Sequence, residues 1–449
     1  MSSYFLKNAL MVNEGRLLEA NILVENDRIS KIIAKNIELK LPINCIEIDF
    51  TGKYILPGVI DDQVHFRDPG LTHKGDLESE SKAAVAGGVT SFMDMPNTIP
   101  NVLSQVVLEE KYRAAIGRSW ANYSFYMGVS NSNADEVLKT NPKNVCGIKI
   151  FLGASTGNML VDDIHTLEKI FSESKMLIAV HCEDENIIQY NLINAKVKYG
   201  DNIPVSQHPV IRSEEACHFS SSFAIELAKK HKTRLHVLHL STAKEMELFS
   251  NDLPLIDKQI TAEVCCHHLW FTDNDYDQKG TLIKWNPAIK KASDRDALLG
   301  ALLNDKIDVV ATDHAPHTLN EKENTYLNSP SGAPMVQHSL VLMLEMMHQG
   351  KISLNKVVEK MCHAPARLFK VSERGFIREG YFADLVVVDL ASPWKVSAEN
   401  IHYKCGWSPL NGQEFHSKVE ATFVNGKLVY RNGEFFAKGQ GKRLLFNRF

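Results

Sequence analysis

The segment Leu177-Ile178-Ala179-Val180-His181-Cys182-Glu183-Asp184 contains a short apolar run that ends in polar side chains. Continuous apolar runs of this length are typical of strands that are buried on both faces of a parallel sheet. Similar runs recur through the middle of the chain, and helix-like segments separate most of them. The runs are Val59–Phe66, Val89–Pro96, Tyr123–Gly128, Cys146–Leu152, Leu177–Cys182, Leu235–Leu240, Gln259–Phe271 and Ile307–Thr312. Eight such units predict an α/β protein with a (β/α)₈ TIM barrel over residues 58–370.

Both ends of the chain have a different texture, with short strands and tight turns. Residues 1–57 include alternating segments such as Asn21–Glu25. Near the other end, Asp384–Leu390 reads as a strand, and Asn425-Gly426 is a typical hairpin turn. We expect residues 1–57 and 371–449 to form one small composite β-sandwich domain beside the barrel.

The charge balance and the cysteines exclude several classes of protein. Lys and Arg number 50 and Asp and Glu number 54, so the formal net charge is −4 and neither nucleic acid nor an anionic membrane is an expected partner. No apolar run is long enough to span a membrane, and the first residues lack the pattern of a secretory signal. The 8 cysteines are scattered without a CxxC pair, which predicts free thiols in a reducing, cytoplasmic setting.

Four of the apolar runs end in residues that commonly bind metal ions. These residues are His65, His181, His239 and Asp313. In a barrel of parallel strands the ends of the runs form one rim, and imidazole and carboxylate groups both suit Zn²⁺. One such residue alone fits a hydrogen-bonded rim residue, but four in one barrel favour a metal site.

Lys149 is unusual because it stands inside an apolar run. A buried ammonium group is costly, so this side chain must reach solvent or find partners. A second interpretation is that CO₂ modifies the amine to a carbamate, which would make it a carboxylate able to bridge two cations. The spacing alone leaves both interpretations open.

Several motifs resemble, in the same order, those of the cyclic amidohydrolases and more narrowly those of the dihydroorotases. The opening strand motif runs from Leu56 to Gly70, and the other motifs are spread over the whole predicted barrel. They are Ala86-Gly-Gly-Val-Thr, Met95-Pro-Asn-Thr, Val180-His-Cys-Glu-Asp, Leu238-His-Leu-Ser-Thr, Trp285-Asn-Pro-Ala-Ile and Ala311-Thr-Asp-His-Ala-Pro-His. The terminal β regions are similar to the composite sandwich of that family.

The resemblance implies a set of metal ligands and a catalytic acid–base. One or two Zn²⁺ ions would be held, with Lys149 carbamylated, and Asp313 would move the proton. The implied ligands are His65, Lys149, His181, His239 and Asp313. The chain departs from the family at Gln63, where the His-x-His motif has its first histidine, so the number of ions stays open. Asp162 is the alternative to Lys149 as a bridging ligand.

The resemblance also implies how the substrate is held. In dihydroorotases an arginine and asparagines bind a free carboxylate, and a guanidinium meets a carboxylate through two hydrogen bonds. The matching residues here are Arg67, Asn97, Asn286 and His317. The implied activity is the reversible cyclisation of N-carbamoyl-L-aspartate to L-dihydroorotate in pyrimidine (UMP) biosynthesis, and a homo-oligomer is an expected assembly. The alternatives are a hydantoinase or allantoinase, and a metal-poor scaffold protein, which Gln63 would favour.

Two further features have a less specific interpretation. His267 and His268 end the seventh apolar run, and we expect them to pack or to orient other ligands. The polar segment Thr318–Ser331 follows the last motif and is a candidate lid over the site.

Overall fold

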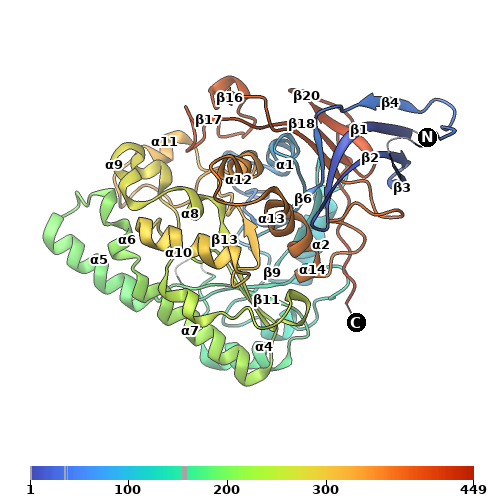
Figure 1. Ribbon diagram of the computed structural model, residues 1–449. Helices are drawn as coiled ribbons and strands as arrows, with labels where there is room; N and C mark the ends of the chain where they lie inside the picture. The colour runs from blue at the N-terminus through green and yellow to red at the C-terminus, as the bar shows by residue number, and fades with distance from the viewer. Residues whose placement is uncertain (1–2, 35–36, 38, 154–158, 449) are drawn as a thin grey trace.

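A closed ring of parallel strands forms the centre of the protein (Figure 1). The computed structural model describes residues 3–34, 37, 39–153 and 159–448. The strands pair in chain order, and a parallel bridge between Val64 and His314 joins the last strand region to the first. The strands of the ring are β6 (Val59–Val64), β7 (Val89–Asp94), β8 (Asn122–Phe125), β9 (Met127–Gly128), β10 (Ile148–Phe151), β11 (Ile178–His181), β12 (Leu235–Val237), β13 (Ile260–Cys265) and β14 (Val309–Ala311). β8 and β9 are separated by one residue and pair with β7 and β10, respectively, so together they form one of eight strand positions in the ring. This confirms the predicted (β/α)₈ barrel.

Helices connect the strands and cover the outside of the ring. Asp184 shows how the sequence starts one of them, since its side chain accepts a hydrogen bond from the backbone N–H of Ile187 and caps α5. The helices are α1 (Leu77–Ala86), α2 (Gln105–Ala115), α3 (Ala134–Val137), α4 (Ile164–Glu173), α5 (Glu185–Tyr199), α6 (His208–Ile211), α7 (Glu214–His231), α8 (Cys266–Trp270), α9 (Tyr276–Lys279), α10 (Ala292–Leu303), α11 (Leu319–Lys322), α12 (Ser339–His348), α13 (Leu354–Val358) and α14 (Ala364–Phe369).

One predicted run was wrong in part. The segment Gln259–Phe271 is not a single strand, because β13 ends at Cys265 and α8 follows at once. The backbone N–H of Phe271 bonds to the carbonyl of His267 and ends this short helix. An apolar run alone does not distinguish a buried strand from a short buried helix.

Strands from the two ends of the chain share one mixed sheet. Its order is β20-β19-β18-β15-β5-β1-β2-β3, with β4 beside β1, and antiparallel pairing of β15 with β5 joins the two ends. Figure 1 shows the blue and red strands together at one side of the molecule. The strands are β1 (Ser3–Asn13), β2 (Arg16–Glu25), β3 (Arg28–Ala34), β4 (Ile46–Asp49), β5 (Tyr54–Pro57), β15 (Leu385–Asp389), β18 (Lys418–Val424), β19 (Lys427–Arg431) and β20 (Glu434–Phe435). A separate hairpin pairs β16 (Trp394–Lys395) with β17 (Glu414–Phe415).

Two further observations concern the described helices and the cysteines. None of the described helices is long and apolar enough to cross a membrane. All 8 cysteines are free thiols, and most of them are buried.

Candidate active site

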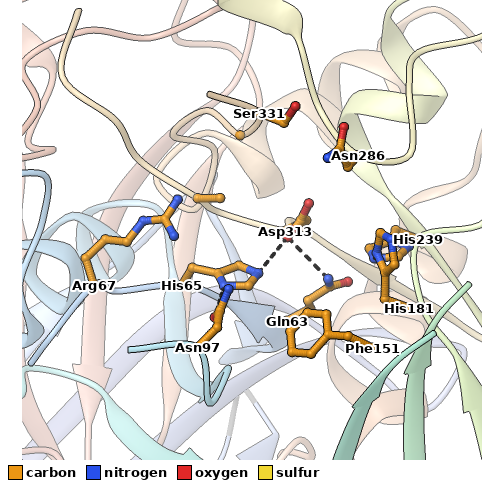
Figure 2. Close-up of a pocket in the computed structure, with 12 residues that line it drawn as sticks. Gln63, His65, Arg67, Asn97, Phe151, His181, His239, Asn286, Asp313 and Ser331 are labelled. Carbon is orange, nitrogen blue, oxygen red and sulfur yellow. Dashed lines mark hydrogen bonds and ion pairs between the residues drawn. The ribbon is translucent and has the colours of Figure 1, made fainter. Parts of the chain in front are cut away.

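A pocket opens at the rim where the strands of the barrel end (Figure 2). Because parallel strands bring their carboxyl ends to one edge, residues far apart in the sequence meet there. Most of the predicted site residues line this pocket, together with Phe151, Ala315, Ser331 and Gly332. The predicted residues in its wall are His65, Arg67, Asn97, His181, His239, Asn286 and Asp313, and Gln63 lies among them.

His181 and His239 form one pair of predicted ligands in this pocket. His181 ends β11 and His239 follows β12, and the Nδ1 atom of His181 lies 3.0 Å from the Nε2 atom of His239. Burial lowers the pKa of both imidazoles, so both rings are neutral at pH 7 and offer lone pairs. A separation of about 3 Å is what two nitrogen ligands of one Zn²⁺ ion show at bond lengths near 2 Å.

Lys149 lies in β10 and is fully buried below the pocket wall. Its Nζ atom has no hydrogen-bond partner among the described residues and lies 4.5 Å from the ring centre of Phe151. Burial lowers the pKa of this amine to about 7. An unpaired amine with a lowered pKa fits the chemistry of a carbamate, because CO₂ reacts with the unprotonated form.

Asp313 is held on the opposite side of the pocket by the side chains of His65 and Gln63. Its Oδ1 atom lies 3.1 Å from His65 Nε2 and accepts a hydrogen bond of 3.2 Å from Gln63 Nε2. Figure 2 shows both contacts as dashed lines, with the second carboxylate oxygen turned towards Asn286 and Ser331. Gln63 therefore acts here as a hydrogen-bond donor to Asp313, a role that the sequence did not suggest.

The predicted ligands thus lie in two pairs, His181 with His239 and His65 with Asp313. Two other groups of three residues, within the part of the chain that the structure describes, have possible ligand atoms that all lie within 4.8 Å of one another. One set is Asp62, His236 and Glu263, and the other is Cys265, His267 and His268.

Arg67 provides the positive charge of the pocket. Its guanidinium is buried, donates from Nε to the carbonyl of Pro316 over 3.0 Å, and lies with Nη2 3.0 Å from His317 Nε2. Lys74 donates to His317 Nδ1 over 2.9 Å, so the proton of this ring is on Nε2 and is directed to the carbonyl of Ser331. The Nη2 group of Arg67 therefore faces another donor and lacks a good acceptor there.

The two asparagines have different surroundings. Asn97 Oδ1 lies 2.7 Å from His65 Nδ1, which fixes the ring of His65. The Oδ1 atom of Asn286 is buried and has no hydrogen-bond partner among the described residues. Asn286 is therefore available to a ligand, whereas Asn97 is already engaged with the residue that contacts Asp313.

Three residues of the site have a left-handed backbone conformation. The φ angles are 67° at Arg67, 38° at His239 and 44° at Asp313. Such angles are costly for residues other than glycine and persist where surrounding contacts enforce them, most often at functional sites. The strain thus falls on the residues to which we assign substrate, metal and proton binding.

Sequence reasoning left open the role of Glu183 and missed Arg212. Glu183 is fully buried, lies 3.1 Å from His181 Nε2, and is paired with the guanidinium of Arg212. Burial opposes ionisation of Glu183, but Arg212 and His181 together lower its pKa to about 2. This carboxylate orients His181, a role that neighbouring groups commonly have for metal ligands. No local motif marks Arg212, which follows the last residue of α6.

A charged cluster lies inside the barrel. His236 Nε2 is 3.2 Å from Asp62 Oδ2 and 3.7 Å from Glu263 Oε2, and its Nδ1 is 2.8 Å from the hydroxyl of Thr261. Burial alone would lower the pKa of His236, but the two carboxylates raise it to about 9. The imidazolium therefore provides the positive charge of this cluster.

The candidate lid is held by two buried lysines. Lys284 donates to the carbonyls of Tyr326 and Ser329, and Lys322 donates to the carbonyls of Lys284 and Pro330. These four lysine–carbonyl contacts hold the segment in this position over the rim. Its opening stays a prediction.

Comparison with known proteins agrees with this geometry. Residues 54–429 match the amidohydrolase family. The chain therefore belongs to the amidohydrolase family and is a metal-dependent hydrolase of cyclic amides.

Within that family, its curated relatives include dihydroorotases. The dihydroorotase of Pyrococcus furiosus is 34% identical over 435 residues, which cover 96% of this chain and 94% of the relative. The dihydroorotase of Methanothermobacter thermautotrophicus is 30% identical over 433 residues, which cover 95% of this chain and 94% of the relative. Among solved structures, L-hydantoinase from Arthrobacter aurescens has a TM-score of 0.92 and 28% identity, with coverage of 99% of this chain and 100% of that one. The resemblance seen in the motifs and the fold class are thereby confirmed.

Proposed function

We propose that the chain interconverts N-carbamoyl-L-aspartate and L-dihydroorotate, using Zn²⁺ bound at the barrel rim. The observation that carries this proposal is the buried guanidinium of Arg67 in the same pocket as Asp313 and the His181–His239 pair. Both compounds carry a free carboxylate that takes no part in the bond change, and Arg67 has a donor group without a good acceptor. Full-length similarity to dihydroorotases supports the same substrate.

The unpaired buried groups indicate where the cation is held. His181, His239 and a carbamate on Lys149 form one three-ligand set, with Glu183 orienting His181. A divalent cation held there supplies Lewis-acid activation of water and of the amide carbonyl. On the other side, His65 and Asp313 are a smaller set, because Gln63 provides an amide where an imidazole would bind a second ion. We infer one strongly held ion.

Binding of the substrate carboxylate orients the reacting amide. The Nη2 group of Arg67 binds the carboxylate, and the side chain of Asn286 binds the neighbouring ring amide. His317 cannot rotate freely, because Lys74 and the carbonyl of Ser331 fix both ring nitrogens. Fixed groups of this kind hold the substrate in a reactive position and lower the entropic part of the barrier.

Asp313 moves the proton. In the hydrolytic direction, the free oxygen of Asp313 accepts a proton from the attacking water and then gives it to the departing ring nitrogen. His65 and Gln63 hold the other oxygen, so the carboxylate keeps one orientation through both transfers. Cyclisation uses the same transfers in reverse.

A substrate panel tests the proposal. The zinc-loaded chain is assayed with L-dihydroorotate, hydantoin and allantoin, and its zinc content is measured on the same sample. We expect turnover of dihydroorotate only, and loss of at least about a thousandfold in Asp313→Asn. Preference for hydantoin, which the similarity to L-hydantoinase would favour, overturns the substrate assignment. A chain without metal and without activity would be a scaffold.

Cytoplasmic localisation and assembly into a homo-oligomer stay predictions. The free thiols support a reducing compartment.

A further inference from the structure

A second group of possible ligands lies next to Gln63, where β13 ends and α8 begins. Cys265 is the last residue of β13, and His267 and His268 lie in the first turn of α8. All three side chains are buried, and their ligand atoms lie within 4.8 Å of one another. The thiol of Cys265 is 3.9 Å from the carboxamide oxygen of Gln63.

The hydrogen bonds of His268 leave one of its nitrogens available. Nε2 lies 3.1 Å from the carbonyl of Pro287 and must donate to it, so Nδ1 carries the lone pair. This Nδ1 is buried and has no hydrogen-bond partner in the described chain. Metal-binding histidines commonly donate their other N–H to a backbone carbonyl in this way.

His267 is fixed in position but is not satisfied. Its ring lies flat against Trp285, with 4.1 Å between the ring centres and 6° between the planes. Neither ring nitrogen has a hydrogen-bond partner of good geometry among the described residues, although the backbone of Thr312 favours a proton on the ring. An unmet buried polar group costs about 1–3 kcal/mol. A bound cation would remove this cost.

The types of donor indicate the type of ion. One thiol and two imidazoles are a set that suits Zn²⁺ and similar transition metals, with a fourth position left for another ligand. Mg²⁺ and Ca²⁺ require oxygen ligands, which these three side chains do not offer.

We propose that Cys265, His267 and His268 bind a Zn²⁺-type cation at a site separate from the His181–His239 pair. On binding, the thiol of Cys265 releases its proton to solvent, and the thiolate and two neutral imidazoles coordinate the ion. None of the three ligands lines the substrate pocket, so this site stands or falls independently of the proposed reaction.

Gln63 connects this site to the catalytic carboxylate. Its carboxamide oxygen faces the thiol of Cys265, and its carboxamide nitrogen donates a hydrogen bond to Asp313. A cation beside the oxygen would hold the carboxamide in this orientation, with the N–H group directed to Asp313. A histidine at position 63 could not present an oxygen to one neighbour and a donor to the other at the same time.

Cobalt titration tests the proposal directly. The full-length chain is stripped with a chelator under reducing conditions and titrated with Co²⁺ alone. A thiolate ligand gives a charge-transfer absorption in the near ultraviolet, which imidazole and carboxylate ligands do not. We expect this absorption in the wild type, its absence in Cys265→Ser, and loss of one equivalent of bound cobalt in that variant.

The neighbouring thiol provides a matched control. Cys266→Ser changes an equally buried side chain outside the cluster and should leave the absorption unchanged. His239→Ala removes a ligand of the other ion and should also retain it. The proposal is wrong if the wild type lacks the absorption or if Cys265→Ser keeps it. Should Cys265→Ser not fold, His268→Gln must weaken cobalt binding, read from this absorption, by about tenfold or more, and unchanged binding overturns the proposal.

Discussion

Gln63 donates a hydrogen bond from its Nε2 atom to the Oδ1 atom of Asp313 over 3.2 Å. The family motif has a histidine at this position, and an imidazole there would bind a metal ion rather than donate to the carboxylate. The carboxamide gives Asp313, the proposed acid–base, a fixed neutral partner. It joins β6 to the loop after β14, its neighbour in the closed ring, which is a contact between residues 250 positions apart.

Gln63→Met removes this donor while it keeps the length of the side chain. A hydrogen bond to a charged group is worth about 1.5–3 kcal/mol, so we expect kcat for dihydroorotate to fall roughly 10- to 100-fold. KM should change little, because Gln63 does not contact the carboxylate of the substrate in our assignment. Steady-state kinetics measure both constants, with the exposed Gln189→Met as control. An unchanged kcat would show that His65 alone holds Asp313.

The position of the site was predictable, but its internal contacts were not. His65, His181, His239 and Asp313 end apolar runs, and parallel strands bring such ends to one rim whatever the details of packing. The pairing of Gln63 with Asp313 depends on side-chain conformations on strands that meet only when the ring closes. No rule of spacing expresses that contact.

The same limit explains the histidines after β13. In the sequence, Cys265, His267 and His268 fall inside one long apolar run that fits a strand, which would direct alternate side chains to opposite faces. The change to a helix at Cys266 instead brings all three ligand atoms within 4.8 Å. Short apolar segments carry too little periodicity to reveal such a change.

Arg67→Gln tests the assignment of the carboxylate partner. Loss of a buried two-bond contact to a carboxylate should cost about 2–4 kcal/mol, so we expect kcat/KM for dihydroorotate to fall roughly 30- to 1000-fold. Any turnover of hydantoin, which has no carboxylate, should be unaffected. The exposed Arg113→Gln serves as control. An equal loss for both substrates would assign Arg67 a structural role instead.

His236→Asn tests the charge balance inside the barrel. Asp62 and Glu263 raise the pKa of His236 against the effect of burial, from 6.5 to about 9. A group whose folded pKa is raised contributes its stability fully below pH 6.5 and loses it as the pH rises through 9. We therefore expect the variant to be less stable than the wild type by about 3–5 kcal/mol near pH 6, with a difference that shrinks by pH 9.5. Urea unfolding at both pH values measures it, and a constant difference would contradict the ionised pair.

In the metal-free chain, Lys149 should make stability change with pH in the opposite direction, and Lys149→Met tests this. Burial lowers the pKa of Lys149 from 10.5 to about 7, so the unfolded chain binds more protons than the folded chain between these values. The stability of the wild type should therefore rise with pH in this window by up to about 1.4 kcal/mol per unit, and that of the variant should not. At pH 7 the variant should be the more stable protein. The exposed Lys229→Met provides the control, and parallel pH profiles would contradict the prediction.

Bicarbonate and zinc should reverse that order at pH 7. A carbamate on Lys149 replaces an amine without partners by a carboxylate that binds the ion beside His181 and His239, so the wild type gains binding energy that the methionine cannot supply. We expect the melting temperature of the wild type to rise on addition of both reagents, and that of Lys149→Met to rise much less. Intact-protein mass spectrometry should find one added carboxyl group on the wild type only. A wild type that binds zinc equally well without bicarbonate would assign the bridging role to another residue, with Asp162 the first to test.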